Sequence, residues 1–179
     1  MTTSETTPET VPETAFETQR RPVPLADGGE LDITLAFLAF ARECVLKKTE
    51  GLTEEQLRRV LVPTGTNLLG LVQHLTDGER YWFGYHVAGQ EEYADVDFDM
   101  AVPADVPAER VLADYRQACA DSDAAIRAAG HPDAPTATPV VRGEPRSLRW
   151  VLAHMTGETA RHAGHADILR EQIDGITGR

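Results

Sequence analysis

Glu158 and His162 stand four residues apart near the end of the chain, a spacing that places both side chains on one face of a helix. Met155 and Leu169 follow the same helical row, so the two polar residues interrupt an apolar seam. A carboxylate removed from water is costly unless it is paired or coordinates a metal ion. The pair therefore favours a site for a divalent cation.

His74 is the candidate for a third ligand. It shares a helical row with Leu71, Tyr81 and Tyr85, so its side chain is expected to face the interior from the middle of its helix. Two histidine nitrogens and one carboxylate oxygen leave at least one coordination position open, as in catalytic zinc sites. Nickel, iron or manganese would suit the same ligands, because selectivity among divalent metals also depends on geometry and supply.

The spacing alone leaves other interpretations open. A histidine on a partly apolar face is often a hydrogen-bonded core residue, and Glu158 and His162 also have the spacing of a helical ion pair. His154 lies one turn before Glu158, and His165 lies three residues after His162. A ligating imidazole usually donates its second nitrogen to an outer partner, so His154 and His165 are predicted behind the ligands.

Other ring residues have less specific roles. Tyr81, Trp82 and Trp150 are candidates for the wall of a substrate pocket beside the metal, although aromatic residues at helical spacing also pack in ordinary cores. His86 and His131 are predicted at the surface.

The elements that must position these residues are helices. Apolar residues recur every three or four residues in four segments, over about 31–49, 67–89, 107–130 and 147–175. No segment has the alternating pattern of a strand. The fold class is therefore predicted to be all-α, as a four-helix bundle.

Turn and cap residues mark where these helices begin and what connects them. Thr66 or Asn67 is expected to cap the second long helix, Pro107 to be the first residue of the third, and Ser147 to cap the last. Thr53 opens a short connector helix. The segment 131–145 has four prolines and is predicted to be a long crossover loop.

Composition limits the classes of function. The 179 residues suit one domain. Residues 1–24, rich in Thr, Glu and Pro, are predicted to form a flexible acidic tail before a folded domain at 25–179. The net charge of −12 repels phosphate backbones and anionic lipid, which argues against nucleic acid and membranes as main partners. Without an apolar span or a signal-peptide pattern, a cytoplasmic location is expected. Cys44 and Cys119 lack the close pairing of a thiolate metal site and are expected to be buried free thiols.

Two stretches carry a resemblance to a known family. They are residues 67–82, NLLGLVQHLTDGERYW, and residues 147–175, SLRWVLAHMTGETARHAGHADILREQIDG. Over about 31–175 the chain resembles the DinB-like superfamily of metal-binding four-helix proteins, with the nearest likeness to its actinobacterial branch, also called mini-circle proteins. In that superfamily one ligand comes from a histidine of the second long helix and two come from the last helix, which implies His74, Glu158 and His162. The related mycothiol-dependent maleylpyruvate isomerases also have glutamate at the position that Glu158 occupies.

The resemblance also implies an activity. Superfamily members of known activity are thiol-dependent transferases or isomerases, in which a low-molecular-weight thiol binds the metal and attacks an electrophile. The expectation is a metal-dependent thiol S-transferase with zinc as the preferred metal, mycothiol as the thiol, a small electrophile as the second substrate and a homodimeric assembly. One alternative is a noncatalytic stress protein that binds a metal or a small molecule. A metal-dependent hydrolase is a weaker alternative, because His154 and His165 are its only evident general bases.

Overall fold

The computed structural model describes residues 22–140 and 142–178. Within these ranges the chain is largely helical, with an isolated β-bridge between Pro135 and Ser147. The predicted all-α fold is confirmed. The tail predicted at 1–24 lies almost entirely outside the described residues. In chain order the elements are α2 (Glu30–Lys47), α3 (Glu54–Leu57), α4 (Leu68–Glu79), η1 (Arg80–Val87), η2 (Glu91–Tyr93), α5 (Ala108–Ala129) and α6 (Leu148–Asp174).

Side-chain caps begin three of the helices where the sequence predicts them. The Thr53 hydroxyl accepts a hydrogen bond from the Gln56 backbone N–H, and the Gln56 side chain accepts one from the Thr53 backbone N–H. Asn67 caps α4 and Ser147 caps α6 in the same manner. Pro107 has an extended backbone and precedes α5 instead of being its first residue, so that prediction was wrong by one position.

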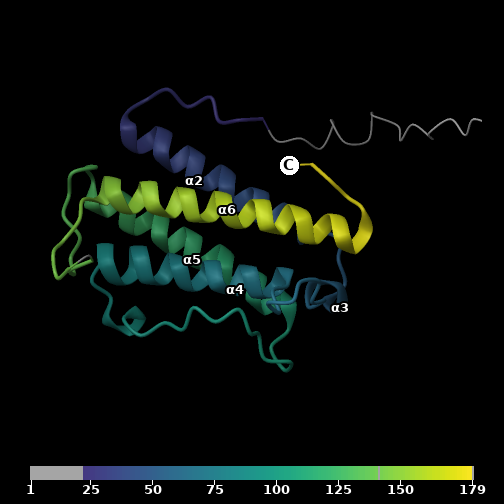
Figure 1. The fold of residues 1–179 in the computed structure, drawn as a ribbon. Coiled ribbons are helices and arrows are strands. Elements are labelled where there is room, and N and C mark those ends of the chain that lie inside the picture. Colours follow the sequence, from purple (N-terminus) through teal and green to yellow (C-terminus); the bar gives the residue numbers. More distant parts are fainter. Residues whose placement is uncertain (1–21, 141, 179) are drawn as a thin grey trace, which may run out of the picture.

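The long helical segments α2, α4 with η1, α5 and α6 pack lengthwise against one another (Figure 1). α2 packs along α6, while α4 packs against both α5 and α6. The segment η1, which continues α4, packs on α5 and α6. The proposed metal ligands therefore come from two helices, α4 and α6, that contact each other. None of the described helices is both long and apolar enough to cross a bilayer.

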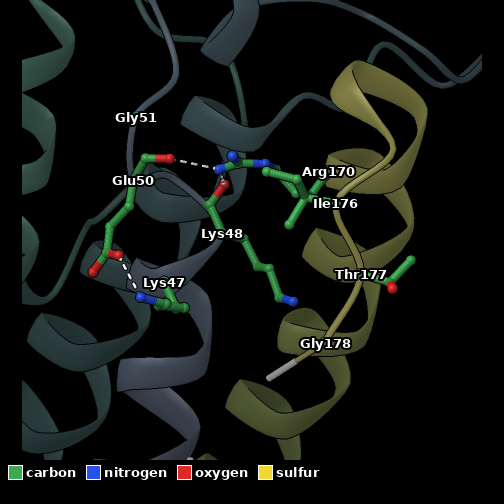
Figure 2. A pocket seen from close by; sticks show the side chains of 8 residues that line it. All are labelled: Lys47, Lys48, Glu50, Gly51, Arg170, Ile176, Thr177 and Gly178. Atoms are coloured by element: carbon green, nitrogen blue, oxygen red, sulfur yellow. Dashed lines mark hydrogen bonds and ion pairs between the residues drawn. The ribbon is translucent and has the colours of Figure 1, made fainter. Parts of the chain in front are cut away.

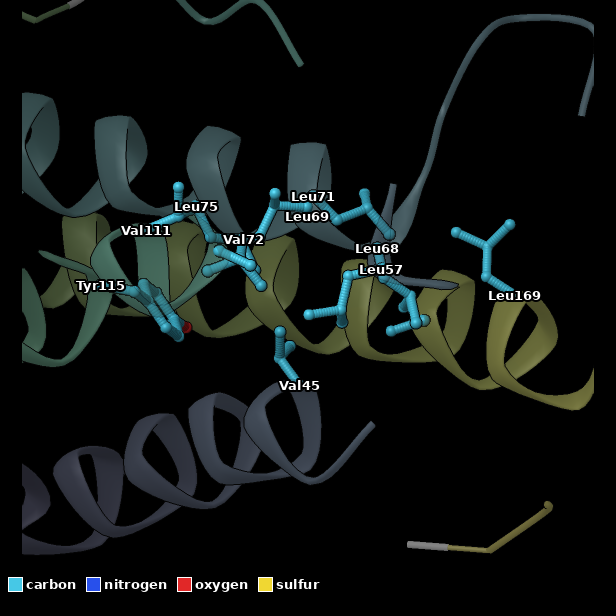
Figure 3. Packing of buried hydrophobic residues seen from close by; sticks show 12 residues of the cluster. Val45, Leu57, Leu68, Leu69, Leu71, Val72, Leu75, Val111, Tyr115 and Leu169 are labelled. Atoms are coloured by element: carbon cyan, nitrogen blue, oxygen red, sulfur yellow. The ribbon is translucent and has the colours of Figure 1, made fainter. Parts of the chain in front are cut away.

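Two clusters of buried apolar side chains fill the space between the helices. Figure 3 shows the first, in which Leu71 and Leu75 of α4 pack with Val45 of α2 and Val111 of α5. The second cluster surrounds Phe83 of η1. Each fully buried side chain of this size contributes about 1.5–3 kcal/mol of transfer free energy. The two clusters hold α4, η1 and α6 against each other, and so fix the helices that carry the candidate site.

The second long helix changes its hydrogen-bonding pattern at Glu79. The sequence predicts one helix from Asn67 to about Gly89, but α4 ends at Glu79 and residues Arg80–Val87 form a π-helix, η1. A π-helix is bonded from residue i to i+5 and holds more residues per turn than an α-helix, and such segments are frequent at functional sites. Side chains after Glu79 therefore point in different directions from those that a continuous α-helix would give.

Candidate functional site

The rings of His74 and His162 lie against each other between α4 and α6. Their centroids are 4.9 Å apart, and the ring planes meet at 67°. His162 is buried, with 5% of its surface exposed, whereas His74 is half-buried. Two histidines that are 88 positions apart in the sequence thus meet where the helices cross.

The two ring nitrogens of His162 have different surroundings. Nε2 is buried and has no hydrogen-bond partner among the described residues. Nδ1 lies 3.4 Å from Nδ1 of His165, so one of the two rings donates to the other there. Burial is the main reason that the pKa of His162 is lowered to about 4, and the charge of His74 adds to the effect. The ring is therefore neutral at physiological pH, as a metal ligand must be.

Glu158 lies one helical turn before His162 and is half-buried. Its Oε2 atom is 3.8 Å from Nε2 of His162. The same oxygen accepts a hydrogen bond from the Arg161 guanidinium, three residues along α6. The carboxylate is therefore paired with Arg161 on its solvent side, and it faces Nε2 of His162 on its inner side without a hydrogen bond to it.

His74 is oriented by a segment that the sequence analysis did not connect with the site. Its Nδ1 atom donates a hydrogen bond of 3.0 Å to the backbone carbonyl of Phe98. The Phe98 ring also packs edge-on against the His74 ring, with centroids 5.8 Å apart. A carbonyl can only accept, so the proton sits on Nδ1 and the lone pair of Nε2 is available. This is how outer partners usually orient a ligating histidine.

The segment that carries Phe98 is held close to α4 by a glycine. A Cβ atom built on Gly70 would lie 2.1 Å from the backbone oxygen of Met100, a contact that real side chains do not make. Phe98 follows no helical period, and its neighbours are mostly acidic, so no sequence pattern indicated its role. The ion pair between Arg161 and Glu158 was predictable, because three residues is a pairing distance on a helix.

The donor atoms suit a divalent metal, although they are not gathered into a finished site. Among the described residues no group of three His, Cys, Asp or Glu side chains is arranged to hold a metal ion. The chemical fit rests on the buried and unpaired Nε2 of His162 beside His74 and Glu158. Nitrogen and carboxylate oxygen are ligands that zinc accepts. To coordinate together, the Glu158 carboxylate would turn from Arg161 toward His162.

A group of aromatic rings extends from these residues along η1 and the first half of α6. The Trp82 ring lies 4.4 Å from the His154 ring, and His154 stacks on Trp150 at 5.4 Å and 15°. Tyr81 packs edge-on against Phe98, 5.3 Å between centroids. We call Tyr81, Trp82, Trp150 and His154 the aromatic wall. Trp150 is 37% exposed, so the wall has a face open to solvent.

The two remaining histidines differ in their surroundings. His131 is exposed, as predicted. His86 was predicted at the surface, which is wrong: only 3% of it is exposed, and its Nδ1 atom forms a 2.7 Å hydrogen bond with the Thr138 hydroxyl. His86 comes eleven residues after Leu75 and four after Trp82, so it lies on the apolar row of its helix and the α-helical period already indicated burial. His154 faces the aromatic wall, and His165 lies behind His162.

A separate pocket of about 270 Å³ lies at the other end of α6 (Figure 2). It is lined by the C-terminal end of α2 and by residues 176–178. Its cations already have partners. Lys48 pairs with Asp167 at 2.6 Å, and Arg170 donates to the backbone carbonyls of Lys48 and Glu50 at 3.0 and 2.7 Å. These bonds join the ends of α2 and α6, so the cations of this pocket have a structural role.

The Cys119 thiol does not compete with an external thiol as nucleophile. No disulfide joins Cys44 and Cys119. Burial raises the pKa of the Cys119 thiol to about 12, so it stays protonated at neutral pH, and the thiolate is the reactive form.

Comparison with known proteins adds one finding. A comparison with curated proteins found no match. The family model described as mycothiol-S-transferase matches residues 34–175, a range that contains His74, Glu158, His162 and the whole aromatic wall. This match agrees with the resemblance to the DinB-like superfamily. With most of its length matched, the chain belongs to the mycothiol-S-transferase family.

Proposed function

We propose that this protein is a thiol S-transferase that joins the sulfur of a low-molecular-weight thiol, mycothiol, to a small electrophile. The observation that carries the proposal is the pairing of the His74 and His162 rings, with Nε2 of His162 buried and unbonded, in a chain of the mycothiol-S-transferase family. The aromatic wall beside these residues would suit a bound small molecule in a noncatalytic protein as well, so the family match is what favours catalysis.

His74, Glu158 and His162 would hold a divalent metal. Zinc is the preferred ion, and nickel, iron or manganese would fit the same donors. When bound, such an ion favours the thiolate over the thiol, and the thiolate is the nucleophile. Three protein ligands leave a position open for an external sulfur.

The residues around the ligands have separate tasks. The Phe98 carbonyl holds the proton of His74 on Nδ1, which leaves Nε2 free to ligate. His165 contacts Nδ1 of His162, as the Phe98 carbonyl contacts Nδ1 of His74. Arg161 neutralises Glu158 when the carboxylate is not engaged with a metal. The aromatic wall offers flat apolar surface to the electrophile and excludes water on that side.

The reaction balances without any further reactant. With chlorodinitrobenzene as the electrophile, a bond forms between the thiol sulfur and the ring carbon that carries chlorine. The carbon–chlorine bond breaks, and chloride leaves with its electron pair. The thiol proton passes to the solvent. No group on the protein is oxidised, reduced or acylated.

The test is a direct assay of the purified full-length protein loaded with zinc. Mycothiol and chlorodinitrobenzene are the substrates, and product is followed by absorbance. We expect many turnovers per protein, and activity at the no-protein background for the His74→Gln variant. The matched control is His131→Gln, which changes an exposed histidine away from the site and should keep full activity.

The alternatives give different results in the same experiment. Stoichiometric uptake of zinc or thiol without turnover would support the noncatalytic binding protein instead. If zinc, nickel and manganese all fail to raise thiol consumption above background, the transferase proposal is wrong for this thiol.

A further inference from the structure

Three charged residues from three helices meet inside the protein, away from the candidate site. Arg42 of α2 donates from Nε and a terminal nitrogen to the two carboxylate oxygens of Glu79, at 2.7 and 2.6 Å. Its other terminal nitrogen donates to Asp123 of α5 at 2.7 Å. Arg42 is only 4% exposed and Glu79 only 1%. The proposed transferase reaction uses none of these residues.

Stability alone is a weak explanation for this cluster. Moving two charges out of water costs several kcal/mol per ion, about as much as their attraction returns, so apolar replacements of a buried pair are often neutral or stabilising. Buried ion pairs are better explained where they specify one geometry among alternatives. The position of Glu79 in the chain indicates which geometry that is.

Glu79 is the last residue of α4, and the π-helix η1 begins at the next residue. Its carboxylate is fixed by Arg42, and its backbone carbonyl accepts a hydrogen bond of 3.4 Å from the Ser122 hydroxyl. Ser122 is itself buried in α5. Both ends of Glu79 are therefore anchored to other helices at the residue where the backbone bonding pattern changes.

The residues immediately after this point belong to the aromatic wall. Tyr81 contacts Phe98, whose carbonyl orients His74, and Trp82 contacts His154. The direction of both rings depends on where the helix changes from i→i+4 to i→i+5 bonding. A shift of that point by one residue would rotate Tyr81 and Trp82 about the helix axis and change their contacts with these partners.

We propose that Arg42, Glu79 and Ser122 are positioning residues that fix the start of the π-helix and thereby hold Tyr81 and Trp82 beside the candidate site. The effect on turnover rests on the proposed function, whereas the effect on ring positions does not. The competing explanation is that the cluster only holds α2, α4 and α5 together.

The decisive variant removes Arg42 and Glu79 together, so that neither is left as an unpaired buried charge, while Asp123 keeps Arg127 at 3.6 Å as a partner. Arg42→Met/Glu79→Met keeps long unbranched side chains in the same space. Contacts between ring protons are measured by NMR in the full-length protein. The cross-peak between Trp82 and His154 reports the π-helix, and the cross-peak between Trp150 and His154, both on α6, is the internal control. The variant control is Arg110→Gln/Asp114→Asn, which removes an exposed pair on α5.

We expect the double variant to lose the Trp82–His154 cross-peak and keep the Trp150–His154 cross-peak. The KM for chlorodinitrobenzene should rise roughly threefold to tenfold, the equivalent of a lost aromatic contact. A folded double variant in which both cross-peaks are unchanged would overturn the proposal. If wild type shows no turnover but the Trp82 contact still depends on the pair, the proposed function fails and this inference stands.

Ser122→Ala provides the second measurement, because it removes one hydroxyl and leaves every charge in place. If the double variant does not fold, the Trp82–His154 cross-peak of Ser122→Ala decides: weakening supports the proposal, and an unchanged peak overturns it. If the double variant folds and shifts Trp82 while Ser122→Ala does not, the positioning role belongs to Arg42 and Glu79 without Ser122.

Discussion

The Nε2 atom of His162 lies 3.8 Å from Oε2 of Glu158, too far for a hydrogen bond, although both atoms are on one face of α6. A helical ion pair between the two would bring them closer, but the neutral His162 ring gains little from the carboxylate, and Arg161 holds that carboxylate instead. A buried nitrogen without a partner costs free energy, about 1–3 kcal/mol. A cation between the two atoms would remove that cost.

The first prediction concerns the ligands themselves. His162→Gln and His74→Gln each remove one nitrogen donor, and each should lower zinc affinity by at least about 100-fold, more than the loss of an outer partner does. Zinc binding is measured by competition with a chromophoric chelator. His131→Gln should bind zinc as wild type does, and equal affinity in all four proteins would place the metal elsewhere.

The second prediction uses two helical glycines. Gly70→Ala forces a Cβ atom against the Met100 carbonyl, so the segment carrying Phe98 must move and release Nδ1 of His74. Zinc affinity should fall by about tenfold, and the free energy of unfolding by about 1–3 kcal/mol. Gly164→Ala on α6 is the control, because a Cβ atom there meets nothing. It should gain up to about 1 kcal/mol from helix propensity and keep zinc affinity. If Gly70→Ala binds zinc with wild-type affinity, the Phe98 carbonyl does not orient His74 for metal binding.

The helices were predictable because their signals are local. Asn67 and Ser147 begin α4 and α6 as expected, and apolar residues at three and four positions define the buried faces. The interior faces predicted for His74 and His162 suggested that they pair, and the family resemblance strengthened that prediction, since spacing within one helix does not say which other helix it meets.

The π-helix and the role of Phe98 were not predictable from the sequence, for physical reasons. The π-helix begins at Arg80, directly after Glu79, which Arg42 and Ser122 hold from distant helices, and no local period records such contacts. The role of Phe98 depends on its backbone carbonyl, an atom that every residue has. The burial of His86 was within reach of the sequence, because the residue lies on the same helical row as Leu75 and Trp82.

The third prediction concerns the aromatic wall. Trp150→Ala removes a ring that is 37% exposed and otherwise packed on Trp82 and His154, so the free energy of unfolding should fall by about 1.5–3 kcal/mol. The KM for chlorodinitrobenzene should rise roughly threefold to tenfold through the lost stacking surface, with zinc affinity unchanged. Phe37→Ala on α2 removes a similarly exposed ring that lies away from the wall, and it should leave KM unaltered. If the two variants behave alike, Trp150 does not contact the electrophile.

The fourth prediction concerns stability and pH. Burial lowers the folded-state pKa of His86 below the value of about 6.5 that it has in the unfolded chain. Between those two values the unfolded chain binds more protons, so the free energy of unfolding falls as the pH falls from about 6.5 toward the folded-state pKa. His86→Phe/Thr138→Val should lose less stability than wild type between about pH 7.5 and about pH 5.5 in urea titrations. Equal losses in both proteins would show that His86 does not titrate on unfolding.

The position of the metal is the most direct test of the whole account. Crystals of the full-length protein grown with zinc are measured at the zinc absorption edge, and an anomalous difference map is calculated. We predict one peak at coordination distance, about 2 Å, from Nε2 of His74, Nε2 of His162 and a carboxylate oxygen of Glu158. The peak should be absent from crystals of His162→Gln. A map without a peak at these three side chains, or with the zinc bound elsewhere, would contradict the account.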